Sequence, residues 1–316
     1  MQKQQVATPD AAHDASALVM QAEFALNKGD MASAQRDYAK ASQTTHDPMV
    51  AERALGLALA LHKPGEAKAA LLRWQALGGD AIGLMQARAQ IALDEGRTDD
   101  ARKLLLKLTA TSDKKAWQAF GRVLLGARDV AQAGGLLSVV ATPERLPDDP
   151  QAWLAMSEMG QKLGKYAYAQ DIADAAVKRF HTLSTYTWSA SLHADRGENR
   201  QAMALYAKAV ALKPKDTDLR LAYAGLMAKT GDNAGAQRVL AKGPQDERTF
   251  AARAAFAART KDHSTLRRIY VELKAAPVSV RSKSYYLLGQ LAALMKQPVQ
   301  AVKWLAKVPA DDDHGV

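Results

Sequence analysis

The sequence predicts an all-α protein, a solenoid of about nine helical hairpins, and three observations predict it. First, a glycine that ends one helix precedes an amphipathic helix closed by proline, as in GENRQAMALYAKAVALKP (197 to 214). Second, the pattern recurs along the chain, again opening on a glycine: Gly29, Gly96, Gly164 and Gly231. Third, no run of alternating apolar and polar residues is long enough to predict a β-sheet.

Small residues recur where two helices of a hairpin must approach closely. The predicted second helices carry this position at intervals of 30 to 36 residues: Ala34, Ala67, Ala101, Ala133, Ala169, Ala202, Ala236, Leu266 and Ala301. The predicted first helices carry the facing residue: Ala22, Ala89, Gly121, Ser157, Ala190, Ala224, Ala254 and Gly289. Leu55 and Leu266 are larger than the pattern requires, so irregular packing is expected in the second and eighth hairpins.

The segments outside the hairpins are short and polar. Residues 1 to 14 lack a signal-peptide pattern and are predicted to be a disordered linker, so the solenoid occupies 15 to 308. Within it, ATPERLPDDP (141 to 150) carries three prolines and predicts a loop, with a possible bend of the array. Residues 309 to 316 are predicted to be an acidic tail.

The repeat resembles a known family in its spacing and in its bulky positions. The period of the repeat lies near 34 residues. Several repeats open on residues that resemble the pattern W-x2-L-G: Trp117 with Phe120-Gly121, Trp153 with Met156, and Tyr285 with Leu288-Gly289. This pattern resembles the tetratricopeptide repeat. The resemblance implies a right-handed superhelix of tetratricopeptide-like hairpins, in which the first helices line a concave groove.

The family geometry implies which residues face that groove. The partner-binding candidates on this chain are Glu23, Glu52, Gln86, Gln90, Arg122, Glu158, Lys162, Lys229, Arg248, Arg259 and Lys283. Two interpretations stay open for each: contact with a partner, or the solvated side of an amphipathic helix. The Lys and Asn pattern with which some tetratricopeptide domains clamp a chaperone's terminal carboxylate is missing, which disfavours a chaperone co-receptor.

Charge is unevenly distributed. The chain carries a formal net charge of +10, with 13 Lys+Arg against 14 Asp+Glu in residues 1 to 113 and 12 against 3 in residues 247 to 308. The basic end, which includes Arg253, is either a solvated surface or a docking site for an acidic protein surface or lipid headgroups. Nucleic acid is not expected as a partner, because acidic and basic groove positions are interleaved.

The residues that would carry chemistry are not arranged for it. There is no cysteine, and the seven histidines are scattered, so neither thiol catalysis nor a zinc site is predicted. His193 is predicted to be a buried packing residue. The glycines form no phosphate-binding motif. We therefore expect no enzyme activity, no cofactor and no metal.

Two segments resemble a narrower group. DPMVAERALGLAL (47 to 59) and YYLLGQLAALMKQPVQAVKWLAKV (285 to 308) look like bacterial outer-membrane tetratricopeptide lipoproteins, one of which is an adaptor for a periplasmic carboxyl-terminal processing protease. That group has a lipidated cysteine, which this chain lacks, and further repeats. The resemblance implies a piece of a longer protein whose lipid anchor lies outside this sequence.

The function expected from these features is a non-catalytic protein-protein interaction scaffold. The narrower resemblance implies a cell-envelope adaptor for a protease, its substrates or both, periplasmic and anchored to the outer membrane when full-length. The alternative is an assembly or export module of a secretion, pilus or polysaccharide machine, and a cytoplasmic location stays open as well.

The C-terminal end is expected to be covered by a neighbour, either by further repeats in the full protein or by self-association through this end. A solenoid normally finishes with a helix whose outer face is polar, but the last predicted hairpin is rich in large apolar residues. Not all of these can face the preceding hairpin. The candidates for self-association are Leu291, Leu294 and Trp304.

Overall fold

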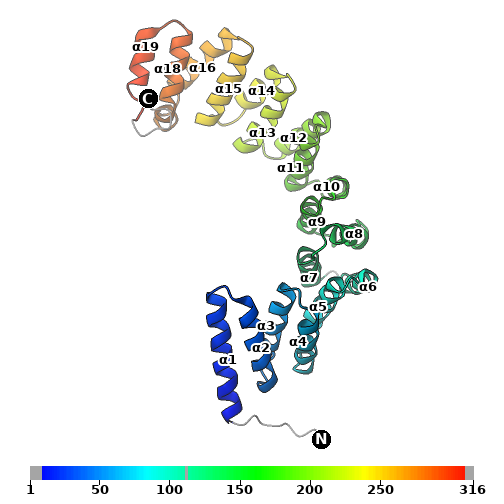
Figure 1. Cartoon of the computed structure of the whole chain (residues 1–316). Coiled ribbons are helices and arrows are strands. Elements are labelled where there is room, and N and C mark those ends of the chain that lie inside the picture. Colours follow the sequence, from blue (N-terminus) through cyan, green and yellow to red (C-terminus); the bar gives the residue numbers. More distant parts are fainter. Residues whose placement is uncertain (1–8, 111–112, 310–316) are drawn as a thin grey trace. The chain divides into compact units, whose positions relative to one another are not determined.

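The computed structural model describes residues 9 to 110 and 113 to 309, and the regular structure within these ranges is helical (Figure 1). The first helices of the hairpins are α1 (Pro9–Asn27), α3 (Pro48–Ala60), α5 (Ala81–Asp94), α7 (Lys114–Leu125), α9 (Pro150–Lys162), α11 (Leu183–Asp195), α13 (Thr217–Lys229), α15 (Glu247–Arg259) and α18 (Tyr285–Leu294). The second helices are α2 (Met31–Thr44), α4 (Pro64–Ala76), α6 (Thr98–Leu108), α8 (Val130–Val140), α10 (Tyr166–Phe180), α12 (Asn199–Leu212), α14 (Asn233–Ala241), α16 (His263–Ala275) and α19 (Pro298–Leu305). The predicted all-α solenoid of helical hairpins is confirmed.

The chain forms two compact units. The N-terminal unit ends at Ala175 and the C-terminal unit begins at Ala176, within α10. In the N-terminal unit one continuous apolar cluster joins α1 to α5, with Tyr38 and Trp74 as its largest buried side chains. In the C-terminal unit an apolar cluster joins α15, α16, α18 and α19.

Aspartates begin most of the helices. The carboxylates of Asp30, Asp232 and Asp262, for example, accept the backbone N–H three residues later, which satisfies one of the free donors at a helix N-terminus. In the turn before each of the first two, a glycine adopts the left-handed conformation, Gly29 at φ +79° and Gly231 at φ +94°. In these two hairpins a Gly-Asp pair therefore sets the turn, and its glycine meets no steric penalty there.

The small residues lie where the repeat pattern places them. Every second-helix member of the set, Leu266 included, is buried, and so is every first-helix member. A contact of this kind involves Ser157, whose hydroxyl donates to the carbonyl of Ala169 at 2.6 Å across the α9/α10 hairpin. His193 is buried as predicted, with its Nδ1 2.5 Å from Glu198 Oε2.

The ends and the loop differ in part from expectation. Helix α1 begins at Pro9, so residues 9 to 14 are helical and the predicted linker is wrong over that stretch, while residues 1 to 8 lie outside the described residues. Residues 141 to 149 form the predicted loop between α8 and α9, and both helices belong to the N-terminal unit. The acidic tail lies outside the described residues from 310 onward. The sequence pattern did not predict α17 (Val278–Arg281) or the 3-10 helix η1 (Ser282–Ser284), which precede α18.

Candidate protein-binding grooves

One hollow in the N-terminal unit lies between α7 and α9, the first helices of two successive hairpins. It has a volume of about 570 Å³, and its floor includes Trp117, Met156 and Met159. Gly121 leaves room for the Met159 side chain, because a Cβ atom at position 121 would lie only 3.2 Å from Met159 Cε. Leu125 is an exposed member of the lining. The hollow therefore offers apolar side chains with an opening to solvent, as ligand sites generally do.

Polar side chains line the same hollow. Lys114 and Arg122 come from α7, and Asp149 and Gln151 come from the start of α9. The guanidinium of Arg122 donates from Nε and Nη2 to Gln86 Oε1 at 3.1 and 2.9 Å. Because Gln86 is neutral, it fixes the position of Arg122 without cancelling its charge. Asp149 caps α9 by accepting the Gln151 N–H at 3.0 Å.

A second hollow, of about 550 Å³, lies between α1 and α3 and is lined by Leu26, Met49, Glu52, Arg53, Gly56 and Leu57. Close to it, the Tyr38 hydroxyl donates to Glu23 Oε1, and burial with this hydrogen bond raises the pKa of Tyr38. Arg53 Nη2 lies 3.9 Å from the same carboxylate. The structure thus places Glu52 in a hollow, and it places Glu23 in a contact between α1 and its neighbours.

Among the remaining groove candidates, one is buried and the others are exposed. Gln90 is buried, and its amide donates to the Gly126 carbonyl at 3.0 Å, so its assignment to a partner-binding surface is wrong: the side chain joins α5 to the end of α7. Glu158 and Lys162 are exposed on α9, and Lys229 is exposed at the end of α13.

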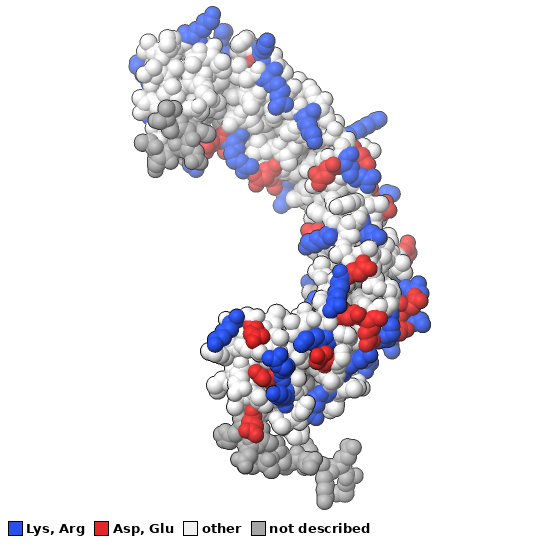
Figure 2. Space-filling model, in the orientation of Figure 1, with Lys and Arg blue, Asp and Glu red and all other residues white. Residues whose placement is uncertain are grey.

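The basic candidates of the C-terminal unit do not converge on one point. Arg248 Nη1 pairs with Asp218 Oδ1 at 2.7 Å. Arg259 is exposed at the opposite end of α15 from Arg248, and Lys283 is exposed in η1. On the face in Figure 2, Lys and Arg side chains follow the edge of the C-terminal hairpins with few acidic neighbours, whereas both signs are mixed over the N-terminal unit.

The three self-association candidates differ in their exposure to solvent. Leu291 is 2% exposed and belongs to the core of α15, α16 and α18, so its assignment to an outer surface is wrong. Leu294 is 54% exposed. Trp304 is half-buried: its ring stacks on Tyr285 with centroids 5.8 Å apart, and its Nε1 donates to the Tyr270 hydroxyl at 3.2 Å.

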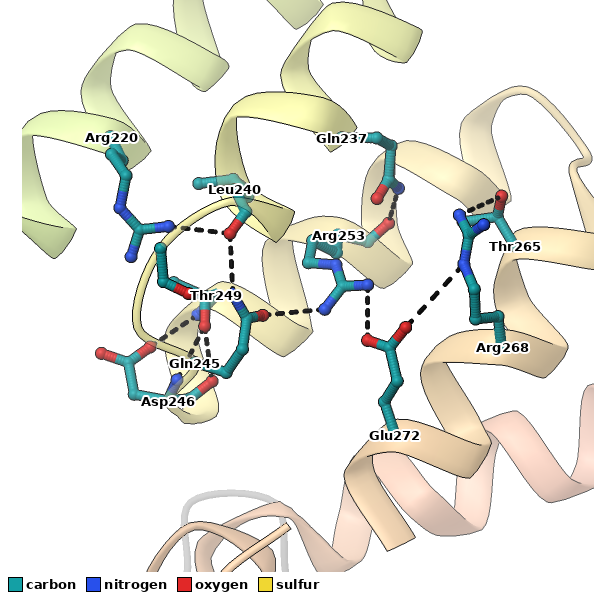
Figure 3. A network of polar contacts seen from close by, with 11 residues as sticks. Arg220, Gln237, Leu240, Gln245, Asp246, Thr249, Arg253, Thr265, Arg268 and Glu272 are labelled. Atoms are coloured by element: carbon teal, nitrogen blue, oxygen red, sulfur yellow. Dashed lines mark hydrogen bonds and ion pairs between the residues drawn. The ribbon is translucent and has the colours of Figure 1, made fainter. Parts of the chain in front are cut away.

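Sequence reasoning missed a buried polar network in the C-terminal unit (Figure 3). Arg220 on α13 is almost completely buried and donates at 2.7 Å to the carbonyl of Leu240 near the end of α14 and to that of Pro244 beyond it. Burial lowers the pKa of the Arg220 guanidinium. Gln245 also donates to the Leu240 carbonyl, at 2.8 Å, and accepts from Arg253 Nη1 at 2.7 Å.

The network continues into the next hairpin. Arg253 Nη2 lies 2.6 Å from Glu272 Oε2 on α16, and Gln237 on α14 donates to the Arg253 carbonyl. Arg253, expected in the basic surface, is instead buried and joins α15 to α16. The network therefore links α13, α14, α15 and α16 across two successive hairpins. The one sequence signal for this network was the position of Arg220 on the apolar side of its helix.

No described helix is long and apolar enough to cross a lipid bilayer. Within the described ranges, no cluster of three or more histidine or acidic side chains is arranged to hold a metal ion.

The hairpins and their repeated joints define the class of this molecule, a helical-repeat solenoid protein. Residues 193 to 260 match the family model for the tetratricopeptide repeat, which is generally a non-catalytic fold for protein-protein interaction. No curated protein sequence matches the chain.

Solved structures of tetratricopeptide proteins overlap the chain only loosely. One from Parabacteroides merdae is 15% identical with a TM-score of 0.31, covering 90% of this chain and 99% of its own. The C-terminal part of a repeat protein from Cytophaga hutchinsonii is 14% identical with a TM-score of 0.38, covering 74% and 98%. Yeast Tom70 is 11% identical with a TM-score of 0.37, covering 93% and 91%. Similarity this low carries no argument about partners.

Proposed function

We propose that this chain is a protein-interaction scaffold that captures a peptide segment of its partner in the hollow between α7 and α9. The observation that carries the proposal is the apolar floor of that hollow, with Trp117, Met156 and Met159. Burial of one large apolar side chain of a partner there contributes roughly 1.5 to 3 kcal/mol.

The polar lining defines the segment further. Within the described ranges, neither Lys114 nor Arg122 has an acidic partner, while Asp149 is occupied in capping α9. A segment with a large apolar residue flanked by a carboxylate therefore fits the hollow best. The cationic side chains would set the orientation of such a segment, and the floor would supply most of the affinity.

The experiment selects short peptides that bind this chain from a display library and measures their affinity for two variants. Leu125→Glu places a carboxylate at the lining of the hollow, and Leu72→Glu makes the same change at an exposed leucine of α4. We expect apolar-acidic peptides whose binding is at least tenfold weaker for Leu125→Glu and unchanged for Leu72→Glu. Equal affinities for the two variants would exclude this hollow as the binding site.

A second, narrower proposal concerns the cellular location of the protein and its partner. We propose an adaptor of the cell envelope, periplasmic and anchored to the outer membrane in the full-length protein, that presents a protease or its substrates. Support comes from the resemblance of residues 47 to 59 and 285 to 308 to outer-membrane tetratricopeptide lipoproteins. Addition of the chain to the carboxyl-terminal processing protease of the same organism should accelerate cleavage of a protein substrate. An unchanged rate leaves the assembly or export module as the better description.

A further inference from the structure

The joints between successive hairpins follow one rule at the first helix. The residue two positions after the small residue packs against the preceding hairpin. In α15 this residue is Phe256, which lies against the cluster formed by α13 and α14 together with Ala252. At the same position the other joints bury a large apolar side chain, at most 9% exposed: Leu57, Ile91, Val123, Met159, Leu192, Leu226 and Leu291.

Helix α1, the first described helix, carries the same position. Its residue there is Phe24, which is 61% exposed, and Met20, the equivalent of Ala252, is exposed beside it one turn earlier. The Phe24 ring is covered on one side by the ammonium of Lys28, 4.2 Å from its centroid. The outer face of α1 is thus built as half of a hairpin joint.

The second helices supply the other half. The residue four positions after the small residue is buried in nearly every hairpin; in α14 it is Leu240, in the same cluster that receives Phe256. In α19 the equivalent residue is Leu305, whose Cδ2 lies toward Gly289 within its own hairpin and which is still 42% exposed. Val302 and Leu294 are exposed on the same hairpin. The outer face of α18 and α19 is the complementary half of a joint.

We propose that these two end faces bind each other between copies of this chain, so that α19 of one copy packs on α1 of the next in the manner of α14 on α15. The pairing matches Leu305 to Phe24 as Leu240 is matched to Phe256. The net charges do not oppose this pairing, because residues 247 to 308 carry 12 Lys+Arg against 3 Asp+Glu, whereas residues 1 to 113 are close to neutral, with 13 against 14. Contact between two C-terminal ends would instead bring like charges together.

Such a contact is heterologous, so it grows into a filament or closes into a ring. It does not involve the hollow between α7 and α9, and it is independent of the proposed peptide binding.

The test measures molecular mass by light scattering over a wide range of protein concentration. The unmodified chain should increase in mass with concentration, to at least twice the mass of a single chain. Phe24→Ser and Leu305→Ser should each remain a single chain, because each lacks one face. Mixed in equal amounts, they should form a complex of twice the single-chain mass and no larger, because each variant keeps the face that the other has lost.

Two matched variants control for general loss of apolar surface. Leu72→Ser and Val271→Ser change exposed residues of α4 and α16 outside the end faces, and they should associate like the unmodified chain. Circular dichroism should give the same helical content for all four variants. Self-association of Phe24→Ser alone or of Leu305→Ser alone would overturn the head-to-tail contact. A single-chain mass for the unmodified protein at every concentration would overturn it as well and leave the faces to a different partner.

Discussion

Arg253 Nη2 and Glu272 Oε2 lie 2.6 Å apart and join α15 to α16 by an ion pair whose arginine side chain is only 3% exposed. Arg268, 65% exposed, lies 3.8 Å from the other oxygen of the same carboxylate. Two arginines thus share one glutamate, one from the interior and one from the surface. Because Arg253 is buried and Arg268 is exposed, their two ion pairs should contribute differently to the free energy of unfolding.

Glu272→Ala should destabilise the C-terminal unit by about 2 kcal/mol, because it leaves the Arg253 charge buried without its partner; the partial exposure of Glu272 keeps the loss below that of a fully buried pair. Arg268→Ala should cost less than about 0.5 kcal/mol, as exposed pairs contribute little. Urea unfolding of the two variants measures the difference. If both shift the midpoint equally, the buried pair is no more important than the surface one.

Lys261 adopts the left-handed conformation, φ +54°, directly before the helix-capping Asp262, where Gly29 and Gly231 occupy the same position in other hairpins. A lysine pays a steric penalty there that glycine does not. Lys261→Gly should therefore stabilise the protein by roughly 0.5 to 1 kcal/mol. Gly231→Lys is the reciprocal control and should destabilise it. A fall in the thermal midpoint of Lys261→Gly would contradict this account of the turn.

Asp262 connects stability to pH. Hydrogen bonds from the Thr265 side chain and backbone and from the Ser264 hydroxyl hold the pKa of the Asp262 carboxyl well below its usual range. A carboxyl with a lowered folded-state pKa contributes stability that is complete above its unfolded pKa, about 4, and is lost as pH falls through the folded value. Asp262→Asn keeps a capping oxygen but does not titrate. The thermal midpoint of the native protein should exceed that of Asp262→Asn at pH 7, and the difference should shrink steadily below about pH 4. A constant difference across this range would exclude the carboxylate as its source.

The hairpins could be predicted from sequence because their determinants are local. A glycine in the left-handed conformation, such as Gly29 or Gly231, sets many of the turns, and small residues such as Ala34 and Ala202 must be buried wherever two helices approach closely. The start of α1 was placed too late because residues 9 to 14 carry no apolar stripe, although Pro9 is a favourable first residue of a helix.

The candidate site was less predictable because exposure depends on neighbours that the repeat pattern does not specify. Arg122 was correctly placed on a first helix and lines the α7/α9 hollow. Gln90, at an equivalent polar position two helices earlier, is buried by Gly126, a contact across 36 residues. Trp117 and Met156 were recognised only as bulky positions of the repeat, and the family pattern gives no sign that they also form the floor of a hollow.

The central claim, capture of a partner segment between α7 and α9, is tested most directly by site-specific photo-cross-linking. A photoreactive amino acid replaces Ala155, an exposed residue that lines the hollow, or Leu72 on α4 as the control. Each protein is irradiated with a peptide selected on the unmodified chain. The account predicts a cross-link at position 155, competed away by excess unlabelled peptide, and none at position 72. Efficient competition-sensitive cross-linking at 72 with none at 155 would contradict it.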